Sequence, residues 1–476
     1  MDSTLACLTG WMPRQRWYAA KGRRPHLRFV ASWDVPTSEA GVRVCTVLVA
    51  DDGTLPAVTY QVPFVARATA SVPSGLGPHI IGHPDPGTTL IDGPHDPAYA
   101  TALLALVTAG GAARGRRTAA TAHTVSPAHA TAAATAHTSS VLTGEQSNTS
   151  ITYRFAGDIP PVICKLYRQV HHGPNPDIEL NVALSEARSP HVPRAVGWLD
   201  GEWPDPTPTQ PADTGSLAFA QQYFPGVEDA WRVALGAAAT GDDFAGRAFD
   251  LGAATADVHH SLAHVLPTRV AAPVDRAALR EAWQRRLSTA IAEVGQLSQT
   301  RRAIEAVYDR ALDVDWPALQ RIHGDYHLGQ VILVPGRGWI LLDFEGEPLR
   351  PMAERVRPDL ALRDVAGMLR SFDYVAGSVR LDHPDRSNTV REWAATARRS
   401  FLSGYADRAG ARATLDGPLL DALELDKAVY EAIYESRSRP TWIVIPLRAI
   451  ERLIARPGSG APSAGAQSAS SSSASS

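Results

Sequence analysis

HGDYHLGQVI, from His323 to Ile332, and LLDFEGEP, from Leu341 to Pro348, place acidic residues beside two short apolar runs. Asp325 and Gln330 are five residues apart, and Asp343 ends the second run. Two strands that flank a turn would bring these side chains to one rim. Phosphoryl transfer from ATP needs one carboxylate to orient the attacking hydroxyl, and a second carboxylate with an amide to hold Mg²⁺. The pattern predicts Asp325 as catalytic base, with Gln330 and Asp343 as metal ligands.

The order of these residues is that of the protein-kinase template, in which an amide follows the catalytic Asp by five residues and a second Asp opens a new segment. Gln330 stands where Asn is expected, with the same carbonyl chemistry and one more methylene. Acids after apolar strands also cap helices or end sheets, so the prediction depends on all three residues. We expect His323 to brace the loop. Glu345 either joins the metal ligands or faces solvent at a strand end.

Two features upstream suit a nucleotide. LTGEQSNTSITYRF joins apolar flanks through small polar residues whose amides and hydroxyls could face phosphates, although it lacks the Gly-rich pattern of a P-loop or protein kinase. Lys165 lies in the apolar run VICKLYR, where a charge needs a partner or a bound anion. Glu179, on the helix that follows, is the expected partner. Strand-end lysines often snorkel, so this assignment depends on the downstream residues.

Composition indicates an ordinary globular protein of two or three domains. The chain has 476 residues, 44% apolar content and a formal charge of −3, without a long basic stripe, so nucleic acid is not an expected partner. The cysteines lack the paired spacing of zinc sites or disulfides, which favours a reducing cytoplasm: Cys7, Cys45 and Cys164. The start of the sequence does not read as a signal peptide, and no apolar run is long enough for a membrane anchor.

The pattern along the chain predicts four parts: a small antiparallel β module over residues 1–92, a β-rich lobe over 93–226, a mostly helical lobe over 227–456 and a disordered tail over 457–476. ATAHT occurs at Ala120 and again at Ala134, and we expect neighbouring strands there. SITYRF and PVICKLYR predict two more strands, followed by a helix in NPDIELNVALSEA. Apolar residues at three and four spacing predict helices over 244–266, 275–297 and 392–410.

Several strings together resemble the actinobacterial maltokinases from about Trp11 to Leu453: RQRWYAAKGR, GEQSNTS, HGDYHLGQV, DFEGEP, RDVAGMLRSFDY and DKAVYEAIYESRSRPTWIVIPL. The resemblance implies an α+β, bilobal fold similar to aminoglycoside phosphotransferases and eukaryotic kinases, with an additional N-terminal cap, a β-rich N-lobe and a mostly α-helical C-lobe. The implied activity is ATP- and Mg²⁺-dependent phosphorylation of maltose to maltose 1-phosphate, which feeds α-glucan and glycogen synthesis from trehalose. The implied partners are a sugar and ATP, and we expect a cytoplasmic monomer.

The resemblance also implies roles for individual residues. Asp325 is the base, Gln330 and Asp343 bind Mg²⁺, and Lys165 with Glu179 orients the phosphates. Adenine would stack near Gln221 to Phe224, with Gln222 and Tyr223 as contacts. The phosphate-covering loop runs from Gly144 to Ser150 and would use Glu145, Gln146, Ser147, Asn148, Thr149 and Ser150.

For the sugar, the last string offers aromatic and charged residues on one helix face and just after it, which can stack on rings and bind hydroxyls: Lys427, Tyr430, Glu431, Tyr434, Arg439 and Trp442. The same pattern also fits a helix that packs its aromatics into the lobe. RPDLALRDVAG replaces an expected Ser-Pro, which leaves the sugar more open than the reaction. Glucosamine phosphorylated at its 6-hydroxyl is therefore an alternative. A catalytically inactive binding module is another, which the presence of Asp325 and Asp343 disfavours.

Overall fold

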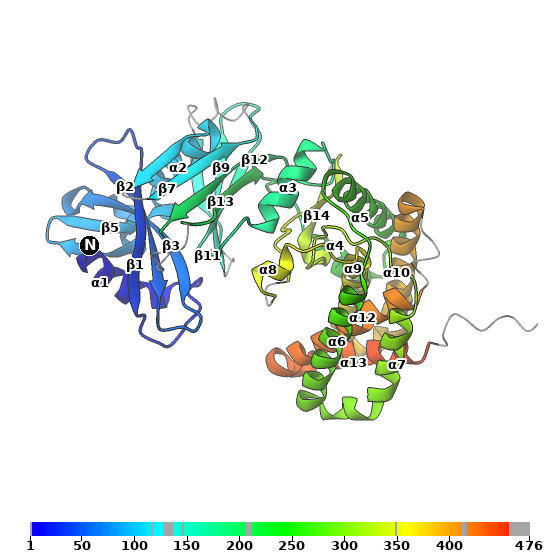
Figure 1. Cartoon of the computed structure of the whole chain (residues 1–476). Helices are drawn as coiled ribbons and strands as arrows, with labels where there is room; N and C mark the ends of the chain where they lie inside the picture. The colour runs from blue at the N-terminus through cyan, green and yellow to red at the C-terminus, as the bar shows by residue number, and fades with distance from the viewer. Residues whose placement is uncertain are drawn as a thin grey trace, which may run out of the picture.

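The computed structural model describes residues 2–115, 118–126, 137–143, 147–204, 212–347, 350–410, 415 and 417–456. Two β-sheets occupy one half of the molecule and a bundle of helices the other (Figure 1). This arrangement confirms the predicted α+β fold with a β-rich N-lobe and a helical C-lobe. The expected tail over 457–476 lies outside the described residues. Among the helices that are described, none is long and apolar enough to cross a membrane.

The first sheet is antiparallel, with the strand order β1-β2-β3-β5-β4. Its strands carry β-branched and aromatic residues that pack with helix α1 on a core containing Trp11, Trp17 and Tyr60. The cysteines in this part, Cys7 and Cys45, carry free thiols, as does Cys164. The elements are α1 (Asp2–Trp11), β1 (Leu27–Val35), β2 (Arg43–Asp51), β3 (Val58–Ala68), β4 (Ile80–Asp85) and β5 (Thr88–Asp92).

The first sheet is fused to the second. Strand β11 (Gln169–Val170) directly follows a strand of the second sheet in the chain and pairs with β3 of the first. Gln61 of β3 donates to the carbonyl oxygens of Tyr167 and Leu217, both at 2.9 Å. Arg168, 1% exposed, donates to both carboxylate oxygens of Asp92. Buried polar groups of each sheet therefore find hydrogen-bond partners in the other.

The second sheet has seven strands in the order β6-β7-β12-β13-β10-β9-β8. The predicted strands of SITYRF and PVICKLYR are confirmed as the neighbours β9 and β10, and the predicted helix follows as α3. Helix α2 packs on β7 and β12. The elements are α2 (Pro97–Ala109), β6 (Ala112–Gly115), β7 (Thr118–Thr124), β8 (His137–Val141), β9 (Asn148–Phe155), β10 (Val162–Tyr167), α3 (Pro176–Glu186), β12 (Ala195–Trp203) and β13 (Asp213–Gln222).

The two ATAHT repeats do not form neighbouring strands, so that prediction is wrong. The first lies in β7, and the second leads into β8, at the other side of the sheet. Four strands lie between them. A repeat of small residues carries no information about partners, because strand pairing depends on side-chain packing across long sequence separations.

The helical half contains the three long helices predicted from apolar spacing, which are α5, α6 and α10. Helices α5 and α10 pack so closely that a Cβ atom at Gly252 would lie 2.0 Å from the carbonyl oxygen of Phe401, and one at Gly404 would lie 2.0 Å from that of Phe249. The helices are α4 (Ala230–Thr240), α5 (Ala245–Val265), α6 (Pro273–Glu293), α7 (Arg301–Leu312), α8 (Met352–Arg355), α9 (Leu362–Asp382), α10 (Ser387–Ala409), α12 (Pro418–Ser438) and α13 (Val444–Ile454).

Candidate active site between the lobes

A β-hairpin brings Gln330 and Asp343 together. Strands β14 (Val331–Val334) and β15 (Gly338–Leu341) are antiparallel, with Val331 opposite Leu341. The residue before β14 therefore lies beside the residues after β15. The Nε2 atom of Gln330 donates to Asp343 Oδ2 at 3.1 Å. The expected convergence of these two side chains is confirmed, and their role as metal ligands stays a prediction.

Asp343 has an unusual backbone. Its φ of 66° lies in the left-handed region, which residues other than glycine adopt at a cost in free energy. The conformation turns the carboxylate toward the N-lobe, where Oδ1 accepts a hydrogen bond from Lys165 Nζ. Lys165 on β10 and Asp343 after β15 thus form an ion pair across the two lobes.

The predicted pairing of Lys165 with Glu179 is wrong. Lys165 Nζ donates instead to Asp177 Oδ2 at 2.9 Å, and Glu179 forms an ion pair with Arg321. Residues two positions apart on an α-helix point about 200° away from each other. Only one of the two acids in the first turn of α3, Asp177 or Glu179, can therefore face Lys165. Asp177 is fully buried, and its Oδ1 accepts hydrogen bonds from the backbone N of Phe344 and from Asn181 Nδ2, both at 2.8 Å.

Three carboxylates surround this lysine. Ligand oxygens of Asp177, Asp343 and Glu345 all lie within 4.8 Å of one another. Burial lowers the pKa of Lys165, but the neighbouring carboxylates outweigh burial and hold that pKa well above its usual value. With the amide oxygen of Gln330, the group offers only oxygen donors, which are the ligands that Mg²⁺ prefers. These residues therefore fit Mg²⁺.

Glu345 accepts a hydrogen bond from Asn148 Nδ2 at 3.1 Å, so it does not simply face solvent. Burial, together with the charges of Asp343 and Asp177, raises the pKa of Glu345 to about 7. The pKa of Glu347, two residues further on, is shifted in the opposite direction. Burial raises its pKa, but Lys427 and Arg350 outweigh burial and lower it.

These opposite shifts predict opposite effects of pH on stability. The unfolded chain loses the Glu345 proton near pH 4.5 and the folded protein near pH 7, so the stability contributed by this group falls as pH rises between the two values. We expect Glu345→Gln to raise the melting temperature of the metal-free protein at pH 8, on the order of a few degrees, with a smaller gain at pH 5. Thermal melting in EDTA measures this.

Glu347→Gln is the matched control. Because the pKa of Glu347 is lowered in the folded protein, its carboxylate stabilises the fold at any pH above the ordinary pKa of glutamate. This contribution is lost only as the pH falls through the pKa of the folded state. Glu347→Gln should therefore lower the melting temperature at pH 8. Equal effects of the two substitutions at pH 8 would contradict the assigned shifts.

Asp325 lies on a loop whose backbone is bound by the side chain of Asp364. The carboxylate of Asp364 accepts from the backbone N atoms of His323 at 2.8 Å and Gly324 at 2.9 Å, and contacts His259 Nε2 at 3.0 Å. Burial raises the pKa of Asp364, but the hydrogen bond and charge of His259 outweigh burial and lower it. The φ of Gly324 is 83°. The loop conformation is thus fixed by a fully buried carboxylate.

His323 braces the same loop, as predicted. Its side chain is 2% exposed, and Nε2 contacts the carbonyl oxygen of Leu342 at 2.8 Å. This contact ties the Asp325 loop to the residue before Asp343. The side chain of Asp325 itself is 21% exposed and lies 3.5 Å from Lys427 Nζ.

The residues predicted to bind sugar divide into two groups. Lys427 and Tyr430 on α12 line a pocket together with Asp325 and Glu347. The pocket shares lining residues with a larger hollow of about 620 Å³, which also contains the half-exposed Tyr434. The shared residues are Arg286, Arg350, Arg363 and Tyr430.

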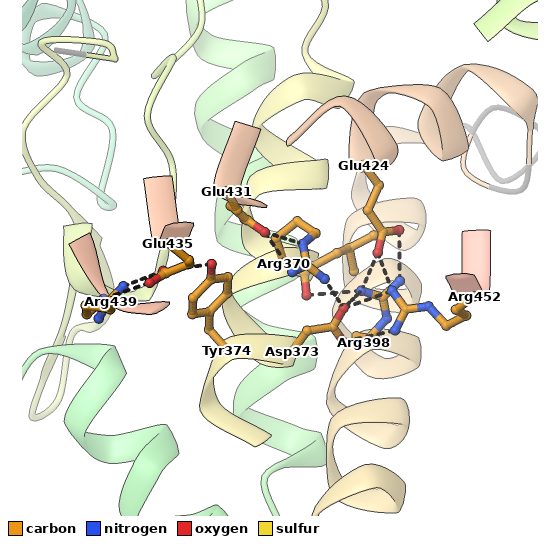
Figure 2. A network of polar contacts seen from close by, with 10 residues as sticks. Arg370, Asp373, Tyr374, Arg398, Glu424, Glu431, Glu435, Arg439 and Arg452 are labelled. Carbon is orange, nitrogen blue, oxygen red and sulfur yellow. Dashed lines mark hydrogen bonds and ion pairs between the residues drawn. The ribbon is translucent and has the colours of Figure 1, made fainter. Parts of the chain in front are cut away.

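The other residues predicted for sugar lie outside these two hollows. Glu431 is buried and accepts from Arg370, with 2.7 Å between Oε2 and Nη2 (Figure 2). Arg439 pairs with Glu435, and Trp442 stacks on Tyr374 with 6.3 Å between ring centroids. Glu431 lies on the same side of α12 as Lys427, but Arg370 engages its carboxylate, and Arg439 and Trp442 follow the helix. Sugar binding by these three residues stays a prediction.

The expected phosphate-covering loop is only partly a loop. Glu145 and Gln146 lie outside the described residues, and Ser147 precedes β9. Thr149 and Ser150 are buried within β9, where Thr149 Oγ1 accepts from Arg168 Nε at 2.8 Å. The prediction of a loop is wrong for these two residues, because β9 begins at Asn148 and its residues from 149 to 153 are all buried. Asn148 at its start contacts Glu345, as described above.

The predicted adenine contacts lie where the chain passes from β13 to α4. Gln222 ends β13, and its Oε1 accepts from Arg337 Nη1 at 3.0 Å. The guanidinium of Arg337 also lies 5.3 Å from the ring centroid of Phe224. The backbone N of Tyr223 donates to the carbonyl oxygen of Pro161 at 2.8 Å. Binding of adenine here stays a prediction.

Known proteins similar to this chain agree with the fold. A solved structure of a glucosamine kinase in complex with glucosamine, ADP and inorganic phosphate superposes with a TM-score of 0.67 and 24% identity, over 94% of this chain and 98% of that one. The chain therefore has a bilobal kinase-like fold. Within that class it carries a particular N-terminal part, because residues 11–96 match the maltokinase N-terminal cap domain.

Two sequence relatives of this chain are glucosamine kinases. A glucosamine kinase of Streptacidiphilus jiangxiensis is 32% identical over 289 residues, which is 57% of this chain and 64% of that protein. A glucosamine kinase of Mycolicibacterium smegmatis is 29% identical over 329 residues, which is 66% of this chain and 79% of that protein. The first match thus spans less than two thirds of its relative. The recognised resemblance is confirmed for the kinase-like fold and the cap.

Proposed function

We propose that this protein is an ATP- and Mg²⁺-dependent sugar kinase. The observation that carries the proposal is the single hairpin that places Gln330 beside Asp343 and ties Asp343 to the loop of Asp325 through His323. The ion pair from Asp343 to Lys165 adds a cation from the facing lobe. This is the set of groups that phosphoryl transfer requires.

The residues have separate tasks in this proposal. Asp325 accepts the proton of the acceptor hydroxyl and orients its oxygen toward the γ-phosphate. Lys427, 3.5 Å away, positions this carboxylate. Lys165 binds phosphate oxygens, and Asp177 holds its ammonium in place. Asp343, Gln330 and Glu345 would hold Mg²⁺, which would supply positive charge against the transferring phosphoryl group.

Maltose is the preferred acceptor, with maltose 1-phosphate as the product for α-glucan synthesis. The carboxylates of the pocket already have cationic partners: Asp325 and Glu347 contact Lys427, and Asp426 pairs with Arg286. An uncharged sugar suits such a balanced pocket better than an amine. The adjoining hollow of about 620 Å³ gives room for a second ring beside Tyr434. The maltokinase-type cap supports the same choice.

Glucosamine is the second candidate, with phosphate transferred to its 6-hydroxyl. Both described relatives are named glucosamine kinases. One feature of the pocket also favours an amine, because the Oδ1 atom of Asp426 is buried without a hydrogen-bond partner among the described residues. A sugar ammonium would supply that partner.

An acceptor assay distinguishes the candidates. The protein is incubated with ATP and Mg²⁺ and with maltose, glucosamine, glucose or an aminoglycoside, and NMR locates the phosphate. We expect the highest kcat/KM for maltose and a phosphate on its anomeric carbon. Glucosamine 6-phosphate as the main product would establish the second candidate, and no transfer to any sugar would contradict both.

Tyr434→Ala tests the second ring directly. Loss of one aromatic contact with a sugar ring should raise the KM for maltose about fivefold, with kcat nearly unchanged. The kinetics with glucose serve as the control, because a single ring does not reach Tyr434. An equal rise in KM for glucose would contradict the placement of the second ring.

A further inference from the structure

A separate hollow lies between helices α9, α10 and α13. It shares no lining residue with the two hollows near Asp325. It has a volume of about 890 Å³, within the range of small-molecule sites. Its apolar lining consists mainly of small side chains, such as Ala376, Ala394 and Ala449, which leave the space open. We call it the arginine groove, because seven arginines line it: Arg380, Arg391, Arg398, Arg399, Arg448, Arg452 and Arg456.

Three of these arginines are neutralised. Arg398 and Arg452 both contact Asp373, which lines the groove, and Glu424, which is 1% exposed beneath it. Arg456 pairs with Asp421. Figure 2 shows Arg398 and Arg452 converging on Asp373 and Glu424.

The other four are not neutralised within the described chain. No ion pair within 4.0 Å joins a carboxylate there to Arg380, Arg391, Arg399 or Arg448, and the remaining acid of the groove, Glu451, has no such pair either. Burial and the positive charge of Arg448 lower the pKa of Arg380 and outweigh the charge of Asp373, which raises it. Arg380 and Arg448 thus bring positive charge together in the groove, and neither forms an ion pair within the described residues.

We propose that the arginine groove is a second anion site, which binds a free small molecule carrying two or more phosphate groups. A guanidinium binds phosphate through two parallel hydrogen bonds, which makes arginine the preferred residue for such ligands. Arginines on three helices can contact phosphates several ångströms apart, whereas one phosphate would engage only part of the groove. The groove is a hollow formed by three helices, which suits a soluble molecule better than a flat membrane surface.

The groove also shares its inner wall with the network that fixes α12. Asp373, which lines the groove, accepts from Arg370 Nη1 at 2.6 Å, and Arg370 holds Glu431 on the opposite side (Figure 2). Glu431 lies four residues after Lys427 on α12. A ligand in the groove is therefore joined to the helix beside Asp325 through a continuous chain of ion pairs.

Binding of inorganic tripolyphosphate to the full chain, measured by calorimetry in EDTA, tests the proposal. The double variant Arg391→Glu/Arg448→Glu reverses two exposed charges, and Arg380→Gln removes a third one if the double variant does not fold. Each should weaken binding at least about tenfold, as expected when charge-assisted hydrogen bonds are lost. Arg301→Glu, an exposed arginine on α7 that lies outside the groove, should leave the affinity unchanged.

The outcomes separate this site from the proposed nucleotide site. If tripolyphosphate binds only near Lys165, the groove variants will bind it as well as the unchanged chain does, which overturns the proposal. Absence of binding at millimolar tripolyphosphate overturns it too. Binding to phosphatidylglycerol vesicles without binding of tripolyphosphate would overturn the assignment to a free ligand. None of these readouts depends on sugar phosphorylation.

Discussion

Asp325→Asn lowers turnover about a thousandfold, and ADP still binds, if Asp325 is the base that orients the acceptor hydroxyl. The amide keeps the shape of the side chain but cannot accept the proton. The loop that carries it should stay in place, because Asp364 holds His323 and Gly324 through their backbone N atoms and not through Asp325. Steady-state kinetics measure kcat, and calorimetry measures the affinity for ADP.

Asp309→Asn is the matched control for this experiment. Asp309 lies on α7 of the same lobe, is 62% exposed and, among the described residues, forms an ion pair with the exposed Arg280 alone. The control should keep normal turnover. Turnover of Asp325→Asn within a few-fold of the control would contradict the role of Asp325, and would favour an inactive binding module over a kinase.

Asp343→Ala should reduce turnover at least as strongly, for a different reason. The substitution removes a carboxylate from the predicted Mg²⁺ ligands and breaks the ion pair with Lys165, which keeps Asp177 and the nearby Glu345. A loss of about a thousandfold or more is expected, because charge on the transferring phosphoryl group is no longer offset. EDTA should likewise abolish transfer by the unchanged protein, and added Mg²⁺ should restore it.

Gln330→Asn is the control for the metal assignment. It keeps an amide oxygen and shortens the side chain by one methylene, as in the protein-kinase template. The variant should keep measurable turnover and require more Mg²⁺ for half-maximal rate. If Asp343→Ala and Gln330→Asn had the same Mg²⁺ dependence as the unchanged chain, neither residue would be a metal ligand.

The fold and the hairpin of the site could be predicted because they depend on local patterns. Runs of β-branched residues predicted strands β9 and β10, and apolar residues at three and four spacing predicted the long helices. Gln330 and Asp343 are only 13 residues apart and flank one hairpin, so their contact follows from the register of two adjacent strands. A pairing between two adjacent strands leaves few alternative positions for these side chains.

Apart from the start of β9, the errors involve contacts between distant segments. Asp177 and Glu179 are both acids in the first turn of α3, and only the position of β10 decides which one meets Lys165. Glu431 fits a sugar-binding face by its spacing, but Arg370, 61 residues earlier, pairs with it in the folded protein. Sequence spacing along one helix does not reveal which buried arginine lies opposite.

The pairing of β11 with β3 has a consequence for motion. Because the two sheets share backbone hydrogen bonds and the buried Arg168–Asp92 pair, we expect them to move as one unit. Closure over the site would then move both sheets together against the helices, about the short connection between Gln222 and Ala230. Residues at the far edge of the first sheet, such as those of β4, would then undergo the largest displacement.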